Sequence, residues 1–514
     1  MRLLRFLLKT LAILTIAILV LRWTHPLPER PKGDAAVSAP AEDDTRLGQA
    51  LLPLIITNPD RTGVIPIADG RDALVARILL ARAASETIDV QYYIWQTDTT
   101  GWLLLDELRK AAKRGVRVRM LLDDNGIPGL DNVLADLAAM ENIEIRLFNP
   151  FTMRKPKLVS YVFDFFRLNR RMHNKSMTVD GLATVIGGRN IGDIYFAYGE
   201  GTAYFDYDVL AVGPGAASVS QNFNDYWTSG SSYDALDILA PSNDGIAEMD
   251  NAVALAAQSA RGSEYAKALD NAPVISGLIA GEDLLEWTTV KLFSDDPAKG
   301  LGQATSGDLL ITRLTQAMGQ PKRSLDLVSA YLIPGQVGTA LFQEFLSNGV
   351  KTRLVTNSLE ANDVPIVHSA WKGYRNQLVR AGADVLELRA RPGQPDTSSL
   401  TQILTSSQSS LHAKTFAVDE ERIFIGSFNF DPRSAALNTE MGFLVDSPTI
   451  ARSLSVALDE SQVFYRVFED KDGKIRWSGT EDKAPKEWMV EPNTSVFQRT
   501  LVNIMSYLPL EWIL

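Results

Sequence analysis

Apolar and polar residues follow two different periods along the chain, and the two periods take turns. Strand-like runs such as TIDVQYYIW and VRVRMLLD flank an amphipathic stretch, LLLDELRKAAKRG. A period of two is typical of strands, and a period near 3.6 is typical of helices. Their alternation predicts an α/β fold built from strand–helix–strand units.

The same strand–helix–strand pattern occurs a second time. KRSLDLVSAYLI, GTALFQEFLSNG and KTRLVTNS in the second half correspond to SETIDVQYYIW, LLLDELRKAAKRG and VRVRMLLDD in the first. Gly115 and Gly349 follow the two helical stretches, where glycine commonly ends a helix. Because Gly115 matches Gly349 and His173 matches His412 at nearly the same offset, we expect two pseudo-symmetric βαβ lobes packed face to face, with equivalent strand ends meeting between them.

The N-terminus predicts a membrane anchor. Arg2, Arg5 and Lys9 precede an apolar run from Leu11 to Leu21 that is extended by the residues before it. A signal peptide is the alternative, but the small-residue cleavage pattern at residues 39–41 lies far from the apolar run. We expect the protein at the cell inner membrane, anchored or peripheral. Positive charges on both sides of the apolar run leave open the side of the membrane on which the catalytic part lies.

The pattern divides the chain into six parts. They are an anchor or signal-like segment at 1–25, a linker at 26–46, a first lobe at 47–241, a connecting region at 242–301, a second lobe at 302–470 and a tail at 471–514. The tail contains SVFQRTLVNIMSYLPLEWIL, whose apolar residues have helical spacing. This segment either lies on a membrane surface or packs on the folded domain.

Composition narrows the chemistry. The 514 residues include no cysteine and only four histidines, and the formal net charge is −11. Disulfides, thiol nucleophiles and thiolate zinc sites are therefore excluded, and we expect no metal site. The acidic balance argues against a nucleic-acid partner, because nucleic-acid binding usually leaves a basic footprint.

Two long motifs carry the candidate chemistry. HNKSMTVDGLATVIGGRN and HAKTFAVDEERIFIGSFN share the pattern His-x-Lys-x4-Asp-x6-Gly-x2-Asn. On a strand, His and Lys two residues apart face the same side, and the Asp lies where a hairpin turn would return the chain and bring Asn beside them. The fixed positions are His173, Lys175, Asp180 and Asn190 in the first motif, and His412, Lys414, Asp419 and Asn429 in the second.

The paired motifs resemble the HKD motifs of the phospholipase D superfamily. The resemblance implies one active site between two lobes, a phosphohistidine intermediate, and no cofactor or metal. By analogy His173 is the nucleophile and His412 the acid and base. The lysines and asparagines would bind the non-bridging phosphate oxygens, and Asp180 and Asp419 would be mainly structural.

Further site residues are expected around the motifs. Glu440 resembles the family's orienting carboxylate of the second lobe, and the register favours Asp206 over Asp208 as its counterpart in the first. Gly188 and Ser427 occupy the same motif position in the phosphate site, so a hydroxyl donor is present in one half only. Two further candidates for binding the substrate are Arg171, in a basic cluster just before the first motif, and His368, for which a packed core histidine is the alternative.

The resemblance extends to cardiolipin synthases of the C type, on segments such as RLNRRMHNKS, LFSDDPAKG, TNSLEANDVPIVH and FIGSFNFDPRS. It implies transfer of a phosphatidyl group to phosphatidylglycerol at a membrane, with phosphatidylethanolamine as a possible second phospholipid substrate. The alternatives are a phospholipase D that uses water as acceptor, a nuclease of the superfamily and a non-enzymatic scaffold. The oligomeric state is left open.

Overall fold

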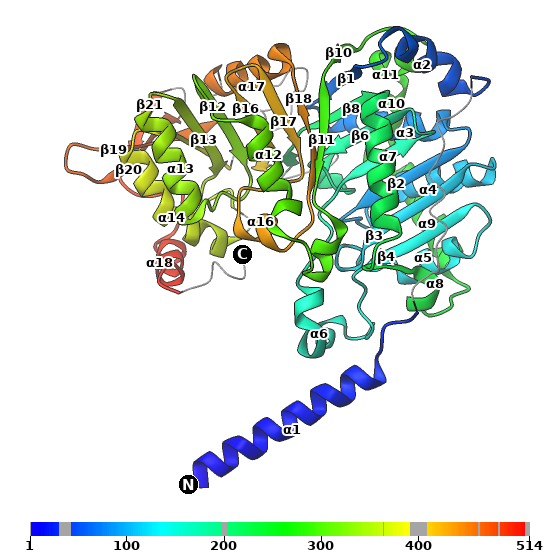
Figure 1. Cartoon of the computed structure of the whole chain (residues 1–514), viewed down its shortest axis with the longest axis horizontal. Helices are drawn as coiled ribbons and strands as arrows, with labels where there is room; N and C mark the ends of the chain where they lie inside the picture. Colours follow the sequence, from blue (N-terminus) through cyan, green and yellow to red (C-terminus); the bar gives the residue numbers. More distant parts are fainter. Residues whose placement is uncertain are drawn as a thin grey trace.

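Each half of the chain is built on its own β-sheet, and the two sheets lie side by side in the computed structural model (Figure 1). The structure describes residues 2–29, 43–196, 203–362, 364–390, 409–460, 463–481 and 484–508. Helices pack against both sheets, which confirms the α/β fold with two lobes that the repeat predicts.

The first sheet has nine strands in the order β10-β1-β8-β6-β5-β2-β3-β4-β9. Its strands are β1 (Thr62–Ile67), β2 (Thr87–Tyr92), β3 (Arg117–Asp123), β4 (Ile143–Phe148), β5 (Ser176–Val179), β6 (Ala183–Gly187), β8 (Asp208–Val212), β9 (Ser232–Asp234) and β10 (Glu286–Thr288).

The second sheet has ten strands in the order β11-β18-β17-β16-β12-β13-β14-β19-β20-β21. Its strands are β11 (Val290–Ser294), β12 (Ser324–Ser329), β13 (Lys351–Asn357), β14 (Asp384–Leu388), β16 (Lys414–Val418), β17 (Arg422–Gly426), β18 (Met441–Val445), β19 (Phe464–Glu469), β20 (Ile475–Glu481) and β21 (Ala484–Trp488). A separate two-stranded sheet pairs β7 (Ala203–Phe205) of the first half with β15 (Ser409–Leu411) of the second.

The helices follow the same division. Those up to the crossing between the sheets are α1 (Arg2–Thr24), α2 (Arg46–Thr57), α3 (Gly70–Ala83), α4 (Thr99–Lys113), α5 (Asp131–Ala138), α6 (Ser160–Leu168), α7 (Pro214–Trp227), α8 (Ala235–Ile238), α9 (Gly245–Gln258), α10 (Ala260–Asp270) and α11 (Pro273–Ile279). Those after it are α12 (Leu310–Met318), α13 (Gly335–Ser347), α14 (Pro365–Arg380), α16 (Pro432–Ala436), α17 (Pro448–Glu460) and α18 (Val496–Met505).

The two predicted βαβ units form where the sequence repeats. β2 and β3 are parallel and joined through α4, and β12 and β13 are parallel and joined through α13. Asp98 caps α4 by accepting a hydrogen bond from the Gly101 amide at 3.0 Å. Gly115 and Gly349 follow the two helices with φ of 99° and 81°, a conformation that glycine adopts without strain.

An apolar core joins the two lobes. Val64, Ile186 and Val209 of the first sheet lie in one buried cluster with residues of the second sheet that include Ile423 and Phe443. Burying this surface stabilises the paired arrangement, because apolar area removed from water is the main favourable term in association. The lobes therefore form a single body, and the ends of their strands are held in a fixed relation.

The boundaries of the lobes differ from those expected. The residues from 242 to 301 do not form a separate connection, because α9 packs on α4 and α5, and β10 pairs with β1 in the first sheet. The chain crosses to the second sheet at Thr289, between β10 and β11. The tail is likewise integrated, since β20 and β21 extend the second sheet and α18 packs on α14. Helical spacing was evident in the tail, but no sequence pattern revealed which lobe either segment joins.

The N-terminal helix stands apart from both lobes. Within the described residues, α1 is the one helix long and apolar enough to cross a membrane. None of its residues is buried against the protein. Figure 1 shows it projecting below the lobes, with its C-terminal end near α6. Most of the expected linker, residues 30–42, lies outside the described residues, as do residues 509–514 of the tail.

Candidate active site

Two β-hairpins carry the motif residues to the junction of the lobes. Lys175 directly precedes β5, Lys414 begins β16, and each asparagine comes three residues after the returning strand, β6 or β17. The hairpins turn at Asp180 and at Asp419, whose φ values of 51° and 56° lie in the left-handed region that such turns use. The turns therefore lie at the far ends of the hairpins from the histidines.

Each catalytic candidate histidine is held by the opposite lobe. His173 Nδ1 lies 2.8 Å from Glu440 Oε2, and His412 Nδ1 lies 2.5 Å from Asp206 Oδ2. The main chain repeats the exchange, because the His173 amide donates to the Thr439 carbonyl at 2.9 Å and the His412 amide donates to the Phe205 carbonyl at 2.8 Å. The residue before each carboxylate thus fixes the backbone of the histidine that the carboxylate contacts.

This exchange corrects the sequence interpretation, which paired each carboxylate with the histidine of its own lobe. Asp206 contacts an imidazole, whereas Asp208 forms an ion pair with Arg77 at 2.9 Å. A carboxylate on Nδ1 orients the ring and leaves Nε2 for chemistry. The sequence could not reveal the exchange, since equal motif spacing is compatible with either pairing.

Ser427 and Gly188 each contact the orienting carboxylate of their own half. Ser427 Oγ donates to Glu440 Oε2 at 2.5 Å and accepts from the Met441 amide at 3.0 Å. A Cβ atom on Gly188 would lie 2.1 Å from Asp206 Oδ1, so the shorter carboxylate needs glycine at this position. The Ser427 hydroxyl thus holds Glu440 in this structure, and its expected donation to phosphate stays a prediction.

The lysine and asparagine side chains complete the two halves. Lys175 Nζ donates to the His173 carbonyl at 2.5 Å, and Lys414 Nζ donates to the His412 carbonyl. Asn190 Oδ1 accepts from the Ile94 amide at 3.2 Å, and its buried Nδ2 makes no hydrogen bond within the described part of the chain. Cations and amides placed this way suit the non-bridging oxygens of a phosphodiester.

Electrostatics distinguish the first histidine. Burial, together with the positive charges of Lys175 and Lys414, lowers the pKa of His173 well below its ordinary value. Burial also lowers the pKa of Lys175 well below the ordinary value for lysine. Burial raises the pKa of Glu440 to about 7, although Lys175 opposes the shift. His173 is thus a neutral imidazole beside a carboxyl that titrates near neutrality.

The second histidine lies beside a stronger anion. Burial and Lys414 lower the pKa of His412 to about 4. Burial acts to raise the pKa of Asp206, but His412 and Lys414 outweigh it and lower that pKa below its usual range. Asp206 is therefore ionised throughout the neutral range, and of the two imidazoles His412 is the one with a permanent negative charge on its Nδ1.

The motif aspartates lie away from this centre. Asp180 accepts from the amides of Ser85, Glu86 and Thr87 at 2.9 Å each, at the start of β2. Asp419 accepts from the Lys322, Arg323 and Ser324 amides in the same way before β12. Each aspartate joins its motif hairpin to the neighbouring strand, which is a structural role.

Two substrate-binding candidates are structural as well. Arg171 is buried, forms an ion pair with Asp123 at 2.8 Å and donates to the carbonyls of Leu168, Phe148 and Asn149. His368 is buried on α14, with Nε2 3.2 Å from Glu491 Oε1. Their partners lie in the interior of the lobes, so neither side chain is available to a lipid headgroup.

Aromatic residues surround both histidines, and sequence reasoning missed the two at His412. The Tyr204 ring stacks on His412 with centroids 5.1 Å apart, and Tyr195 meets the same imidazole edge-on at 5.2 Å. Tyr93, for which the sequence left open a place beside the substrate or in a half-buried strand, as for Tyr92 and Trp95, meets His173 edge-on at 5.1 Å. Tyr204 precedes Asp206 by two residues, and that shared strand face is the signal that would have found it.

The fold and this geometry define a phosphodiester transferase of the phospholipase D type, with one site made by two halves. The chain matches the family model described as "Cardiolipin synthase, PLD-like domain" over residues 78–227 and 314–461. It is 43% identical to Cardiolipin synthase C of Escherichia coli over 471 residues, which is 91% of this chain and 100% of that protein. Cardiolipin synthase B of Escherichia coli is 25% identical over 70% of this chain and 71% of its own.

Among solved structures, phosphatidylserine synthase of Haemophilus influenzae superposes with a TM-score of 0.53 at 14% identity, covering 82% of this chain and 91% of that chain. This likeness shows the fold. The family model and the Escherichia coli relative show more, and the chain belongs to the cardiolipin synthase family of phospholipase D-like enzymes. Its activity is accordingly that of a phosphatidyltransferase.

Proposed function

We propose that the enzyme transfers a phosphatidyl group from one phospholipid to the glycerol headgroup of phosphatidylglycerol, with His173 as nucleophile and His412 as acid and base. The observation that carries the proposal is the crossed pairing, in which Glu440 and Asp206 orient two imidazoles at one junction. Phosphatidylglycerol as a donor is in line with the likeness to Cardiolipin synthase C, and phosphatidylethanolamine is proposed as a second donor.

The unequal carboxylates support the assignment of roles. His173 is neutral in the free site because burial and two lysines oppose its protonation, and a neutral imidazole has the lone pair that attacks phosphorus. A bound phosphodiester monoanion would offset the lysine charges and favour an imidazolium. That imidazolium forms more readily at His412, because Asp206 is ionised, than at His173 beside Glu440.

The first step breaks the bond between phosphorus and the leaving alkoxide and forms the bond between phosphorus and His173 Nε2. His412 gives its proton to the leaving oxygen. In the second step His412 takes the proton of the incoming alcohol, whose oxygen attacks phosphorus and releases His173. In this proposal Lys175, Lys414 and Asn190 hold the non-bridging oxygens through both steps, and their positions beside the two histidines support that role.

A membrane location accompanies this substrate. The apolar helix α1 has the length and composition of a membrane span, and both proposed substrates reside in a bilayer. We place the enzyme at the cell inner membrane for this reason.

The test uses detergent-solubilised full-length protein with phosphatidylglycerol alone, and then with phosphatidylethanolamine added, in the presence of EDTA. Mass spectrometry resolves the products. We expect cardiolipin in both reactions, with glycerol or ethanolamine released. Phosphatidic acid without cardiolipin would identify a hydrolase instead, and inert lipids would direct the search to nucleic-acid phosphodiesters.

A further inference from the structure

We propose that the segment of η2 (Lys157–Val159) and α6 is a bilayer-docking surface that seats the mouth of the active site on the phospholipid surface. Its apolar foot consists of Leu158, Val162, Phe165 and Phe166. The proposal deepens the proposed function and rests on it, since a transferase acting on bilayer lipids must bring its site to the headgroups.

The apolar foot faces away from the protein. Leu158 is 77% exposed, Val162 60% and Phe166 79%, and Phe165 is more than a third exposed. Phe163 and Leu168 of the same short helix are buried on its inner side. Exposed apolar residues that gather on one element mark a surface that binds a partner or a membrane.

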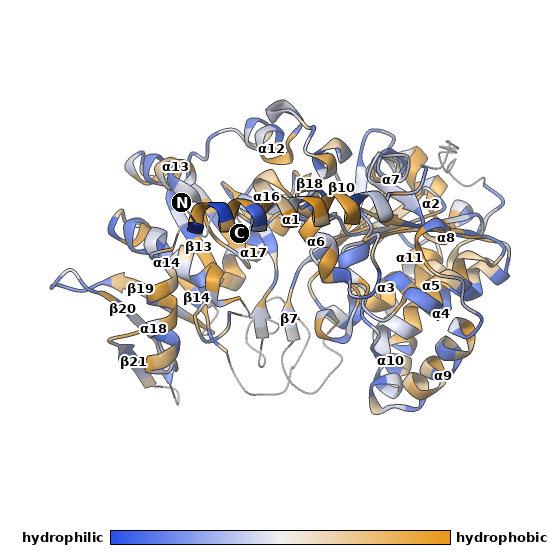
Figure 2. Ribbon diagram, turned by 90° about the horizontal axis from the view of Figure 1, so that it is seen from below, coloured by the Kyte–Doolittle hydropathy of each residue, from blue (hydrophilic) through white to orange (hydrophobic). Residues whose placement is uncertain are grey.

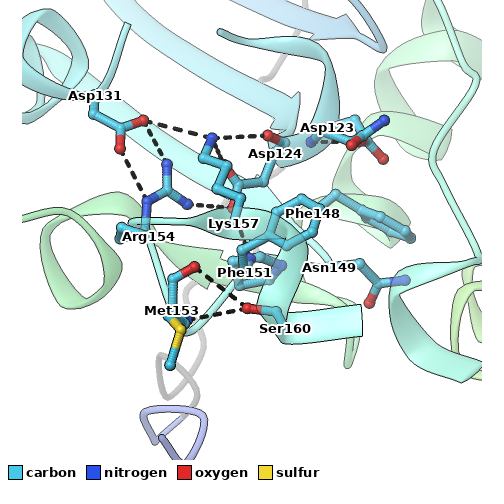
Figure 3. A network of polar contacts seen from close by, with 12 residues as sticks. Asp123, Asp124, Asp131, Phe148, Asn149, Phe151, Met153, Arg154, Lys157 and Ser160 are labelled. Carbon is cyan, nitrogen blue, oxygen red and sulfur yellow. Dashed lines mark hydrogen bonds and ion pairs between the residues drawn. The ribbon is translucent and has the colours of Figure 1, made fainter. Parts of the chain in front are cut away.

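Polar contacts hold the apolar foot in this position. Figure 3 shows Arg154 and Lys157, which lie just before α6, reaching the carboxylates of Asp124 and Asp131. Arg154 contacts Asp131 at 2.5 Å, and Lys157 contacts Asp124 at 3.2 Å. Ser160, the first residue of α6, exchanges hydrogen bonds of 3.3 Å with the Met153 backbone. These contacts fix the backbone of the segment, so its apolar side chains stay exposed on the outer side.

The same network continues into the catalytic site. Asp123, adjacent to Asp124, accepts from the Met172 amide at 2.8 Å, one residue before His173. On the other side, Arg433 of the second lobe donates to the Asn169 carbonyl at 2.8 Å. The apolar foot therefore stands at the junction of the lobes, where the two catalytic halves meet.

The position of α1 identifies the occupant as a bilayer. The His25 and Phe163 rings lie 6.0 Å apart, and the C-terminal end of α1 contacts α6. Figure 2 shows both helices adjacent and largely hydrophobic when the molecule is viewed from below. Whatever surrounds the C-terminal end of a membrane-spanning α1 also covers α6.

The charges between the two helices fit lipid headgroups. A cavity of about 420 Å³ lies between α1 and α6, and its lining includes Arg22, Arg170 and Phe166. Arg167 also lines it, paired with Asp164 at 2.6 Å, so the net charge of these side chains is positive. Arginine binds phosphate through its planar fork of donors, and apolar residues beside it enter the acyl region. This arrangement of cations above an apolar tip suits the interface of a phospholipid bilayer.

The cysteine-free sequence permits a direct test on the full-length protein. Phe166→Cys and, as matched control, Leu255→Cys on α9, which is 71% exposed, would each carry an environment-sensitive nitrobenzoxadiazole label. The labelled proteins are reconstituted in vesicles of phosphatidylglycerol with brominated acyl chains. We expect quenching of the label at position 166 by about two-fold or more and little change at position 255. Equal quenching at the two positions would overturn the proposal.

An activity comparison separates docking from folding. Val162→Asp with Phe166→Asp is expected to lower cardiolipin formation in vesicles about ten-fold and to leave turnover of short-chain phosphatidylglycerol in detergent unchanged. Leu255→Asp is the control. Equal loss in both substrates would mean that the foot serves packing, which overturns the proposal. Wild-type protein that forms no cardiolipin in either medium would instead contradict the proposed function, while the quenching result would still report docking.

Discussion

The two halves of the active site have the same plan but differ in how the carboxylate is held. In the second lobe Glu440 accepts hydrogen bonds from two hydroxyls, Ser427 Oγ at 2.5 Å and Ser434 Oγ at 2.7 Å. In the first lobe the shorter Asp206 accepts from the Tyr207 amide at 2.8 Å and packs against Gly188. The longer acid thus comes with a hydroxyl, and the shorter acid comes with a glycine.

The difference teaches that near symmetry in sequence permits a division of labour. Asp206 remains charged, whereas the pKa of Glu440 is raised to about 7 by burial. Each acid sits on the histidine of the other lobe, so the asymmetry of one lobe sets the chemistry of the other. Variants that act on one half at a time can break or sharpen this comparison.

The largest loss of activity is expected from replacing either histidine with asparagine. His173→Asn and His412→Asn should each lower transfer by about 10³-fold or more. A phosphatidyl ester with a p-nitrophenyl leaving group needs no proton on departure, so His412→Asn should still release one equivalent of nitrophenolate and retain the phosphatidyl group. His173→Asn should release none. A burst from the His173 variant would reverse the two roles.

The next largest losses of activity are expected from replacing the two carboxylates, and the two losses should differ in their dependence on pH. Asp206→Asn removes a permanent charge and is expected to cost about 10²-fold or more in kcat/KM from pH 6 to 8. Glu440→Gln mimics the protonated carboxyl, which dominates below pH 7 and gives way to carboxylate above it. Its loss should therefore grow from pH 6 to pH 8, to about ten-fold. A loss that is flat with pH would show that the charge of Glu440 does not matter.

The supporting residues should show a smaller contrast. Gly188→Ala places a Cβ atom against Asp206 and is expected to lower kcat about 10²-fold, because catalytic geometry tolerates little displacement. Ser427→Ala removes one hydrogen bond to Glu440, worth about 1 kcal/mol, and should cost under ten-fold. Steady-state kinetics with thermal unfolding as a control measures both, and equal losses would contradict the proposed difference.

The smallest effects on catalysis are expected at the hairpin turns. Asp180 is fully buried and Asp419 is partly exposed, although each accepts from three successive amides. Water can replace the bonds of Asp419 but not those of Asp180. Asp180→Asn should lower the free energy of unfolding by about 2–3 kcal/mol, and Asp419→Asn by about 1 kcal/mol or less. Urea unfolding tests this, and activity per folded molecule should stay constant.

Much of the fold and of the motif geometry followed from the sequence. The repeat predicted the two βαβ units, because helix and strand periods are local and the glycines after α4 and α13 mark their ends. The fixed spacing of each motif predicted the hairpins, since a turn is specified by the few residues within it. The assignment to two phospholipase D-like lobes is confirmed by the family match.

The remaining features depend on contacts between distant segments. The pairing of His173 with Glu440 joins residues 267 positions apart, and no local pattern encodes which lobe supplies the partner. Arg171 reads as a surface cation from its basic neighbours, but Asp123 and three carbonyls hold it in the interior. The same applies to β10 and β21, which are short strands whose sheet is chosen by tertiary packing.

The crossed carboxylates also constrain how such a chain evolves. A gene encoding one lobe alone would express a histidine without its acid and an acid without its histidine, so it could work only as a paired copy. After duplication and fusion, the two halves are free to diverge in sequence but not independently. A change at Asp206 is constrained by Gly188 in its own half, against which its carboxylate packs, and its effect falls on His412 in the other half. A mutation at the carboxylate of one lobe therefore alters the histidine of the other lobe.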